Sequence, residues 1–134
     1  MKIKNFVDKT TNFLFRRLSE LSGLVLLVLS VLLLISLVSY SPEDPNFIFT
    51  ENIATKNLLG TKGSFTSDLL FQSIGLISFL LSFTIFFTGI NLVINKSFLI
   101  IIENIFYSIV YCILGSFFFT TFYPNSFLLS INGN

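Results

Sequence analysis

Three long stretches without charged residues constrain this chain more than any other feature. No Asp, Glu, Lys, Arg or His occurs in residues 21–42, 69–95 or 104–134, and Leu, Ile, Val and Phe dominate all three. The hydrocarbon core of a bilayer, roughly 30 Å thick, is crossed by about 20 mostly apolar residues in a helix. A soluble domain of this size cannot bury so much apolar surface. The sequence therefore predicts an all-α membrane protein with three transmembrane helices.

The remaining composition points away from catalysis. Charged residues make up 11% of the chain, against about 25% in a soluble domain. Histidine is absent and Cys112 is the single cysteine, so an intrachain disulfide and a metal site built on His or paired Cys are excluded. No phosphate-loop motif occurs. We predict no catalytic, cofactor-binding or metal-binding residue, no cofactor, and a chain that is not an enzyme.

Residues 1–20 are basic, and we interpret them as a cytoplasmic N-terminal segment. Apolar residues recur at helical spacing within it, so it can form an amphipathic helix at the membrane surface. A flexible basic tail is the alternative. A cleaved signal peptide is disfavoured, because the apolar region of such a peptide is usually about 7–15 residues long. The apolar run 21–38 is longer.

Prolines and interfacial aromatic residues mark the ends of the predicted spans. Tyr40 with Pro42 follows the first apolar run, and Tyr123 with Pro124 follows the third. The predicted segments are a transmembrane helix over 21–39, an extracytoplasmic loop of about 27 residues over 40–66, a transmembrane helix over 67–93, a cytoplasmic turn over 94–97, a transmembrane helix over 98–122 and an extracytoplasmic tail over 123–134.

Orientation follows from the distribution of lysine and arginine, which favour the cytoplasmic side of short loops. With the N-terminus inside, the basic residues on the outer side are only Lys56 and Lys62. The cytoplasmic side collects Lys2, Lys4, Lys9, Arg16, Arg17 and Lys96. We predict a multi-pass membrane protein whose N-terminus is cytoplasmic and whose C-terminal residue, Asn134, is on the outer side.

Small residues within the predicted spans are candidates for helix packing, because they allow helices in lipid to approach closely. These candidates are Gly75, Ser78, Ser82, Gly89, Ser108, Cys112 and Ser116. They can pack helices of one chain together or form a homo-oligomer. Glu103 lies near the start of the third span, where its carboxylate can reach the membrane surface. The positive end of the helix dipole stabilises a negative charge at this position. We therefore predict an interfacial position for it rather than a role in transport.

The loop and the start of the second span resemble a known family. The segments that carry the resemblance are Ser39-Tyr40-Ser41-Pro42-Glu43-Asp44-Pro45-Asn46-Phe47, Asn57-Leu58-Leu59-Gly60-Thr61-Lys62-Gly63-Ser64 and Ser67-Asp68-Leu69-Leu70-Phe71-Gln72-Ser73-Ile74-Gly75-Leu76. Their order and spacing are similar to the membrane region of the FtsK/SpoIIIE DNA translocases. The specific part of the resemblance covers residues 39–76.

This resemblance implies a location and a function as well as a fold. The membrane would be the bacterial inner membrane, with the loop 40–66 and the tail 123–134 in the periplasm. Members have about four N-terminal transmembrane helices, then a linker and a cytoplasmic ATP-driven DNA motor. The membrane region anchors the motor at the division septum and contributes to assembly of the division machinery. The chain would then be a membrane-anchoring and septum-interaction module, a partial four-helix anchor without its motor, that couples chromosome segregation to cell division. A small multi-pass transporter or channel subunit is the alternative.

The resemblance also names expected partners: the lipid bilayer, other cell-division membrane proteins and further copies of the chain, with no direct binding of nucleic acid. The candidate interaction loop comprises Tyr40, Pro42, Glu43, Asp44, Pro45 and Phe47. Within it the acidic pair Glu43 and Asp44, held between prolines, is the candidate contact surface; a solvated turn is the alternative. Some positions depart from the family pattern: Ser64 replaces an alanine, Phe47 replaces a frequent tryptophan, and a proline common late in the second helix is absent.

Overall fold

Four helices make up the fold. A computed structural model describes residues 2–45 and 54–122, with side chains from residue 7 onward. The helices are α1 (Lys2–Val38), α2 (Gly60–Ile74), α3 (Ile77–Asn95) and α4 (Leu99–Phe122), and no strand occurs in these two ranges. Three segments are long and apolar enough to cross a membrane: Val7–Val38 within α1, then α3 and α4. The predicted all-α membrane fold with three spans is confirmed.

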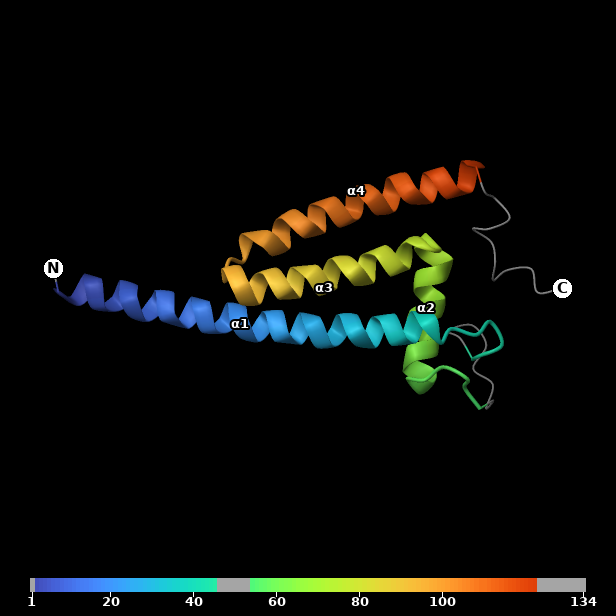
Figure 1. Ribbon diagram of the computed structural model, residues 1–134, viewed down its shortest axis with the longest axis horizontal. Coiled ribbons are helices and arrows are strands. Elements are labelled where there is room, and N and C mark those ends of the chain that lie inside the picture. Colours follow the sequence, from blue (N-terminus) through green and yellow to red (C-terminus); the bar gives the residue numbers. More distant parts are fainter. Residues whose placement is uncertain (1, 46–53, 123–134) are drawn as a thin grey trace.

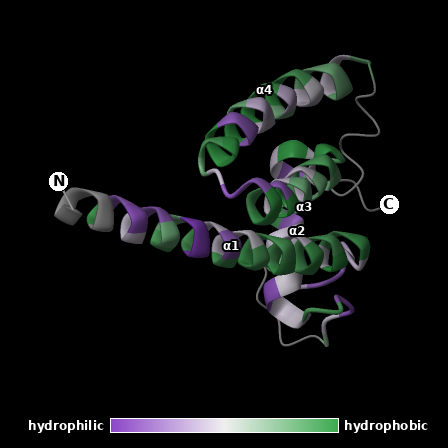
Figure 2. Cartoon of the chain, turned by 60° about the vertical axis from the view of Figure 1, so that its left-hand side comes forward, coloured by the Kyte–Doolittle hydropathy of each residue, from purple (hydrophilic) through white to green (hydrophobic). Residues whose placement is uncertain are grey.

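The three long helices run alongside one another, and α3 lies between α1 and α4 (Figure 1). Helices α1 and α4 point the same way, and α3 runs back between them. Helix α2 lies across one end of this layer, next to the C-terminal end of α1. Apolar residues cover α3, α4 and most of α1, whereas hydrophilic residues gather on the N-terminal part of α1 and at the helix ends (Figure 2). This distribution matches a layer of helices inside lipid.

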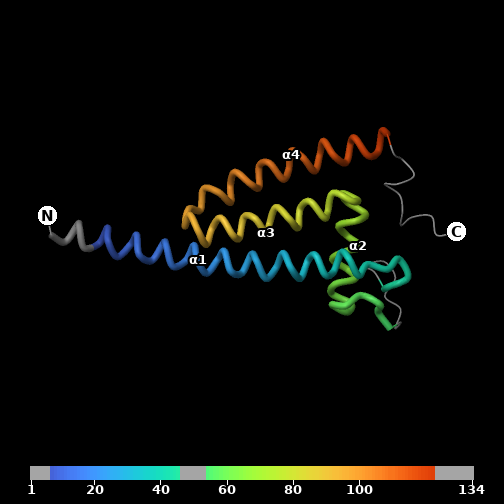
Figure 3. The backbone as a smooth tube through the Cα atoms, viewed as in Figure 1, coloured from blue at the N-terminus to red at the C-terminus, as the bar shows by residue number. Residues whose placement is uncertain are grey.

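Helix α1 is longer than a membrane crossing needs. Its 37 residues correspond to about 55 Å at roughly 1.5 Å per residue. The N-terminal part of α1 extends beyond the ends of α3 and α4 (Figure 3). Because the helix continues from Lys2 to Val38 without a break, a flexible tail over residues 2–20 is excluded, and the predicted boundary between residues 20 and 21 is not a helix end.

The predicted single helix over 67–93 is wrong, because the chain turns sharply at Gly75. Helix α2 ends at Ile74 and α3 begins at Ile77. Gly75 lies between them with φ 60° and ψ −140°, a backbone conformation that residues with a Cβ atom rarely adopt. The second span is therefore only α3. Helix α2 begins at Gly60, so the last part of the predicted loop 40–66 is helical as well.

Helices α1 and α3 form the closest contact in the bundle. A Cβ atom added to Gly89 would lie 2.9 Å from the carbonyl oxygen of Gly23, and one added to Gly23 would lie 2.8 Å from the carbonyl oxygen of Gly89. The Ser82 hydroxyl donates a hydrogen bond to the Ser30 carbonyl at 3.0 Å, and Leu92 is completely buried. Small residues thus bring the two backbones together, as expected for helices packed in lipid.

Helix α4 packs more loosely than the other spans. None of its residues is buried. It contacts α3 through hydrogen bonds from the Asn104 amide to the Thr88 hydroxyl, at 2.7 Å, and from the Tyr111 hydroxyl to the Thr84 hydroxyl, at 2.9 Å. An apolar cavity of about 370 Å³ lies between α1, α3 and α4. Hydrogen bonds between polar side chains therefore join α3 to α4 next to this cavity.

Candidate functional site

The candidate site is the loop between α1 and α2, of which the structure describes residues 39–45 and 54–59. Phe47, a predicted member of the interaction loop, lies outside the described residues. The rest of the loop packs against the C-terminal end of α1 and the start of α2. Its polar groups are used mostly within the protein, which decides which residues remain available for other molecules.

Asp44 joins the two described parts of the loop. Its side chain is buried, with 7% exposure. One carboxylate oxygen accepts a hydrogen bond from the Lys56 amide at 2.8 Å, and the other accepts one from the Asn57 amide at 2.8 Å. Hydrogen bonds to a charged acceptor contribute about 1.5–3 kcal/mol each when they are well formed. Asp44 is therefore placed to stabilise the loop rather than to present a charge to solvent.

Asn57 connects the loop to the end of α1. Its side-chain amide donates hydrogen bonds to the carbonyls of Ser36, at 2.9 Å, and Ser39, at 3.3 Å. These carbonyls belong to the last turn of α1 and its continuation, where oxygens lack partners within the helix. The side-chain oxygen of Asn57 accepts a hydrogen bond from the Leu59 amide at 3.0 Å, just before α2. The buried side chain of Asn57 thus forms hydrogen bonds both at the end of α1 and just before the start of α2.

Helix α2 is attached to the end of α1 at further points. The Ser36 hydroxyl donates to the Gly63 carbonyl at 2.7 Å, and the Ser64 hydroxyl donates to the Pro45 carbonyl at 2.9 Å. Tyr40 adds a contact farther along α2, where its hydroxyl donates to an Asp68 carboxylate oxygen at 3.1 Å and its ring lies 4.8 Å from the Phe71 ring. These contacts hold α2 across the end of the bundle.

Glu43 differs from its neighbour Asp44. Its side chain is 74% exposed and forms an ion pair with Lys56. The hydrogen bond and the charge of Glu43 raise the pKa of Lys56 above its ordinary value of 10.5. The two carboxylates were expected to form one contact surface, but the structure separates them: Asp44 is inside and Glu43 is outside. Pro42 is exposed beside Glu43, whereas Pro45 is buried.

The predicted packing residues occupy different environments. Ser78, Ser82 and Gly89 are buried on α3, and Gly75 is buried at the turn that precedes it. On α4, Ser108, Cys112 and Ser116 are only partly buried. The Ser108 hydroxyl donates to the Asn104 carbonyl of its own helix. Glu103 is exposed on the first turns of α4.

Sequence reasoning missed Asn57 and the polar residues that join α3 and α4. Thr84 and Thr88 are four residues apart, and Asn104 and Tyr111 are seven apart, so each pair occupies one face of its helix. Polar side chains at helical spacing in an apolar run are the signal that could have identified this contact. Asn57 gave no comparable signal, because its role depends on carbonyls that lie 18 and 21 residues away in the chain.

At the cytoplasmic end predicted from the sequence, charged residues connect α1 to the turn after α3. Glu20 lies 2.6 Å from the Lys96 ammonium and 2.6 Å from the Arg17 guanidinium. Lys96 adopts a left-handed conformation at the C-terminal end of α3. In the part of the chain that the structure describes, no group of three or more His, Cys, Asp or Glu side chains could hold a metal ion.

Comparison with known proteins supplies the family. Residues 15–133 match the family described as the 4TM region of DNA translocase FtsK/SpoIIIE. A protein of Azospirillum brasilense named DNA translocase FtsK is 33% identical over 94 residues, which cover 69% of this chain and 15% of that protein. A protein of the same name from Rickettsia prowazekii (strain Madrid E) is 32% identical over 73 residues, covering 54% of this chain and 10% of that protein.

The match to a third relative has the same extent. The DNA translocase FtsK of Rickettsia bellii (strain RML369-C) is 34% identical over 73 residues, again 54% of this chain and 10% of the relative. The chain thus spans only a small part of the length of these relatives. No solved structure matches. The family match covers most of the chain, and it includes α3, α4 and all of α1 from residue 15 onward. The chain therefore belongs to the family of the FtsK/SpoIIIE membrane (4TM) region.

Proposed function

We propose that this chain anchors a DNA translocase in the inner membrane at the division septum, and that the anchored translocase couples chromosome segregation to cell division. The observation that carries the proposal is the family match over residues 15–133. Three helices that can cross a membrane agree with an anchoring role. Within this proposal, the chain binds no ATP or DNA itself, and its partners are lipid, division proteins of the same membrane and further copies of the chain.

The proposed orientation places the N-terminus in the cytoplasm. The N-terminal part of α1, with Lys9, Arg16 and Arg17, lies at the same end of the bundle as Lys96. Lys56 of the loop and Lys62 of α2 lie at the opposite end. The basic residues are thus concentrated at one end, and lysine and arginine favour the cytoplasmic side. The loop, α2 and the end of α4 then face the periplasm.

We infer that the periplasmic contact surface for division proteins is smaller than the predicted interaction loop. It consists of four exposed residues, Pro42, Glu43, Lys56 and Leu58. The buried residues Asp44 and Asn57, which are hydrogen-bonded to each other, hold this part of the loop in place. Leu58 is 77% exposed, and an exposed apolar residue beside an ion pair is a suitable start for a protein contact. A preformed loop also avoids the entropy cost of ordering on binding.

A transporter or channel subunit is less well supported. Transporters place interrupted helices and paired polar groups near the middle of the membrane. The interruption at Gly75 lies instead where α2 meets α3, near the end of the bundle (Figure 1).

Localisation and orientation are tested with fusions to the 134-residue chain. A fluorescent fusion should concentrate at mid-cell during division, and an even distribution around the envelope would contradict the septal role. A reporter enzyme that is active only outside the cytoplasm should be active when fused after Asn134 and inactive when fused before Met1. The reverse pattern would overturn the orientation.

The contact surface is tested by comparing Glu43→Ala with Lys9→Ala, an exposed charge at the other end of the bundle. If the surface binds a division protein, Glu43→Ala lowers septal fluorescence while Lys9→Ala leaves it unchanged. Equal septal signal in both variants would remove the assignment. Asp44→Ala is unsuitable here, because it would disrupt the loop through the Lys56 and Asn57 amides.

A further inference from the structure

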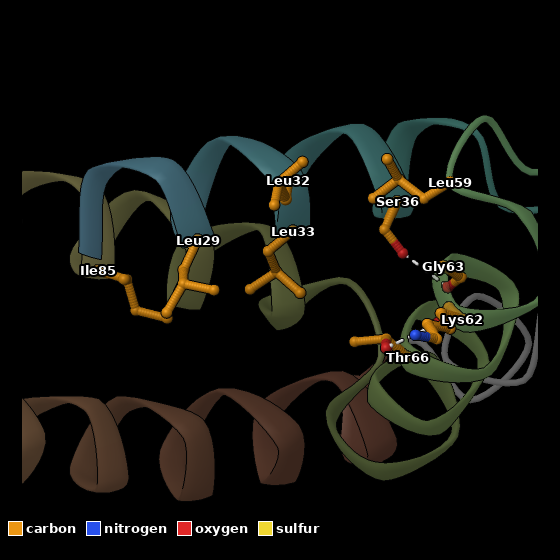
Figure 4. Close-up of a pocket in the computed structure, with 9 residues that line it drawn as sticks. All are labelled: Leu29, Leu32, Leu33, Ser36, Leu59, Lys62, Gly63, Thr66 and Ile85. Carbon is orange, nitrogen blue, oxygen red and sulfur yellow. Dashed lines mark hydrogen bonds between the residues drawn. The ribbon is translucent and has the colours of Figure 1, made fainter. Parts of the chain in front are cut away.

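A groove of about 450 Å³ opens where α1, α2 and α3 meet. Its apolar part is formed by Leu29, Leu32 and Leu33 of α1 and by Ile85 of α3, and its other end is formed by α2 with Lys62 and Thr66 (Figure 4). Leu29 and Leu32 are 53% and 40% exposed, so the groove is open along the side of the bundle. It combines a hydrocarbon wall with a cation at one end.

Two hydroxyls at this end donate hydrogen bonds within the protein. The Ser36 hydroxyl donates to the Gly63 carbonyl, and the Thr66 hydroxyl donates to the Lys62 carbonyl. Lys62 is exposed, and its ammonium has no ion-pair partner among residues 7–45 and 54–122. Among these residues the groove therefore presents the Lys62 charge, without an ion-pair partner, next to an apolar surface.

The position of the groove decides what surrounds it. Lys62 precedes Gly63, whose carbonyl accepts a hydrogen bond from Ser36 in the last turns of α1. Helix α1 ends just before Tyr40 and Pro42. Aromatic residues at such positions mark the boundary between hydrocarbon and headgroups, and lysine side chains extend toward the headgroups from there. The four apolar residues lie farther along α1 and α3, at the depth of the acyl chains. The charge and the hydrocarbon wall are thus arranged in the order found in a phospholipid.

We propose that this groove binds one anionic phospholipid, with its phosphate at Lys62 and an acyl chain along Leu29, Leu32 and Leu33. The occupant is chosen by charge complementarity: an anionic lipid supplies both the negative charge and the apolar chain, whereas an apolar helix of a partner supplies only the second. That the lipid belongs to the periplasmic leaflet rests on the orientation proposed above. The binding site itself does not depend on that orientation.

The test uses the purified 134-residue chain in phosphatidylcholine vesicles that contain a minor share of phosphatidylglycerol with a photoreactive acyl chain. Light should attach the probe to the α1 peptide that contains Leu29, Leu32 and Leu33. Because one lysine near an anionic surface changes affinity about fivefold, Lys62→Ala should lower labelling about fivefold. Lys56→Ala is the matched control, because Lys56 lies at the same end of the bundle as Lys62 but forms an ion pair with Glu43.

A second variant separates the apolar part of the site from its charge. Leu32→Trp keeps Lys62 and fills the groove, so it should also lower labelling. Equal labelling of Lys62→Ala and Lys56→Ala, or a probe attached outside the groove, would overturn the proposal. A photoreactive amino acid of about the size of leucine, placed at position 32 of the protein in cell membranes, provides an independent measurement. A lipid adduct supports the proposal, and a protein adduct identifies a partner helix as the occupant and overturns it. Helix content by circular dichroism confirms that each variant is folded.

Discussion

The contacts of α3 with its two long neighbours, α1 and α4, are built in different ways. Helices α1 and α3 meet at Gly23 and Gly89, where each glycine faces the backbone of the other helix. Helices α3 and α4 meet through hydrogen bonds of Asn104 and Tyr111, beside a cavity of about 370 Å³. The α1–α3 contact depends on glycines, which have no side chain between the two backbones, and the α3–α4 contact depends on polar side chains.

This difference has consequences for stability. In lipid, helices associate by packing and by hydrogen bonds between helices, because burial of apolar surface gives little advantage there. Interhelical hydrogen bonds average only about 0.6 kcal/mol, whereas overpacking a close contact costs about 1–3 kcal/mol. We therefore expect the α1–α3 contact to be sensitive to added atoms and the α3–α4 contact to separate more easily. Four predictions test the comparison, from the largest expected effect to the smallest.

Gly89→Ala should destabilise the protein by about 1–3 kcal/mol. The added Cβ would lie 2.9 Å from the Gly23 carbonyl oxygen and 2.9 Å from Leu27 Cγ, and a helix backbone cannot move aside locally. Gly115→Ala is the matched control, because its Cβ would meet only the side chain of Ile77, at Cδ1 and Cγ1, which can rotate. Both variants gain the same helix propensity, so their difference reports packing.

Unfolding in mixed micelles, followed by circular dichroism, measures these free energies. The expected order is a clear loss for Gly89→Ala and little change for Gly115→Ala. A loss of equal size in both variants would show that the two contacts are equally tight and would remove the distinction drawn above.

Asn104→Leu combined with Tyr111→Phe should destabilise the protein by about 1 kcal/mol, at roughly 0.6 kcal/mol for each hydrogen bond. The hydroxyls of Thr84 and Thr88 keep their own hydrogen bonds to α3 carbonyls, so no buried group is left without a partner.

The same double variant should loosen α4 selectively. Spin labels at exposed Asn91 and Ile102 report the α3–α4 distance, and labels at Leu24 and Asn91 report the α1–α3 distance. We expect a broader distance distribution for the first pair only. Broadening of both pairs would mean that α4 supports the α1–α3 contact, contrary to the comparison.

Ser82→Ala should cost about 0.6 kcal/mol, less than Gly89→Ala, although both residues lie in the α1–α3 contact. It removes a single hydrogen bond to the Ser30 carbonyl and adds no atoms. Ser73→Ala is the control, because the Ser73 hydroxyl bonds only to Leu69 in its own helix. The same unfolding measurement applies; if Ser82→Ala proved as damaging as Gly89→Ala, hydrogen bonding rather than close approach would dominate this contact.

The Glu43–Lys56 ion pair lies in neither helix contact, and its loss at alkaline pH should have the smallest effect of the four changes. Glu43 raises the pKa of Lys56 above 10.5, so the ion pair contributes stability below that pH. The contribution is lost as the pH rises through the raised pKa. Both side chains are exposed, and such pairs contribute little. The difference in unfolding temperature between the parent chain and Glu43→Gln should be small and should vanish at high pH. A difference that grew with pH would contradict the assignment.

Much of the architecture was predictable from the chain alone. The uncharged stretches predicted three spans, and Tyr40 with Pro42 predicted the end of the first; such patterns are local, because the bilayer imposes length and apolarity on each helix separately. The turn at Gly75 was missed, since a glycine in an apolar run is also compatible with a continuous transmembrane helix. Contacts of Ser36 with Gly63 and of Tyr40 with Asp68 hold the earlier part of α2 across the end of α1, so the chain turns after α2 before it continues as α3.

The candidate loop shows the same limit. Glu43 and Asp44 are adjacent and chemically similar, and their sequence suggested one acidic surface. Only the position of the Lys56 and Asn57 amides, which lie 12 and 13 residues away from Asp44, places one carboxylate inside and leaves the other in solvent. Which member of such a pair is buried depends on contacts distant in sequence.

By itself the sequence determined that the chain resides in a membrane, that three apolar helices can cross it and which family it resembles, because composition, helix length and motif spacing are properties of local segments. The tertiary structure alone decided that the second predicted span is two helices, that Asp44 and Asn57 support the loop, and that α1–α3 is close-packed while α3–α4 is joined by hydrogen bonds. The physical reason is that backbone approach and buried hydrogen bonds depend on which distant segments meet.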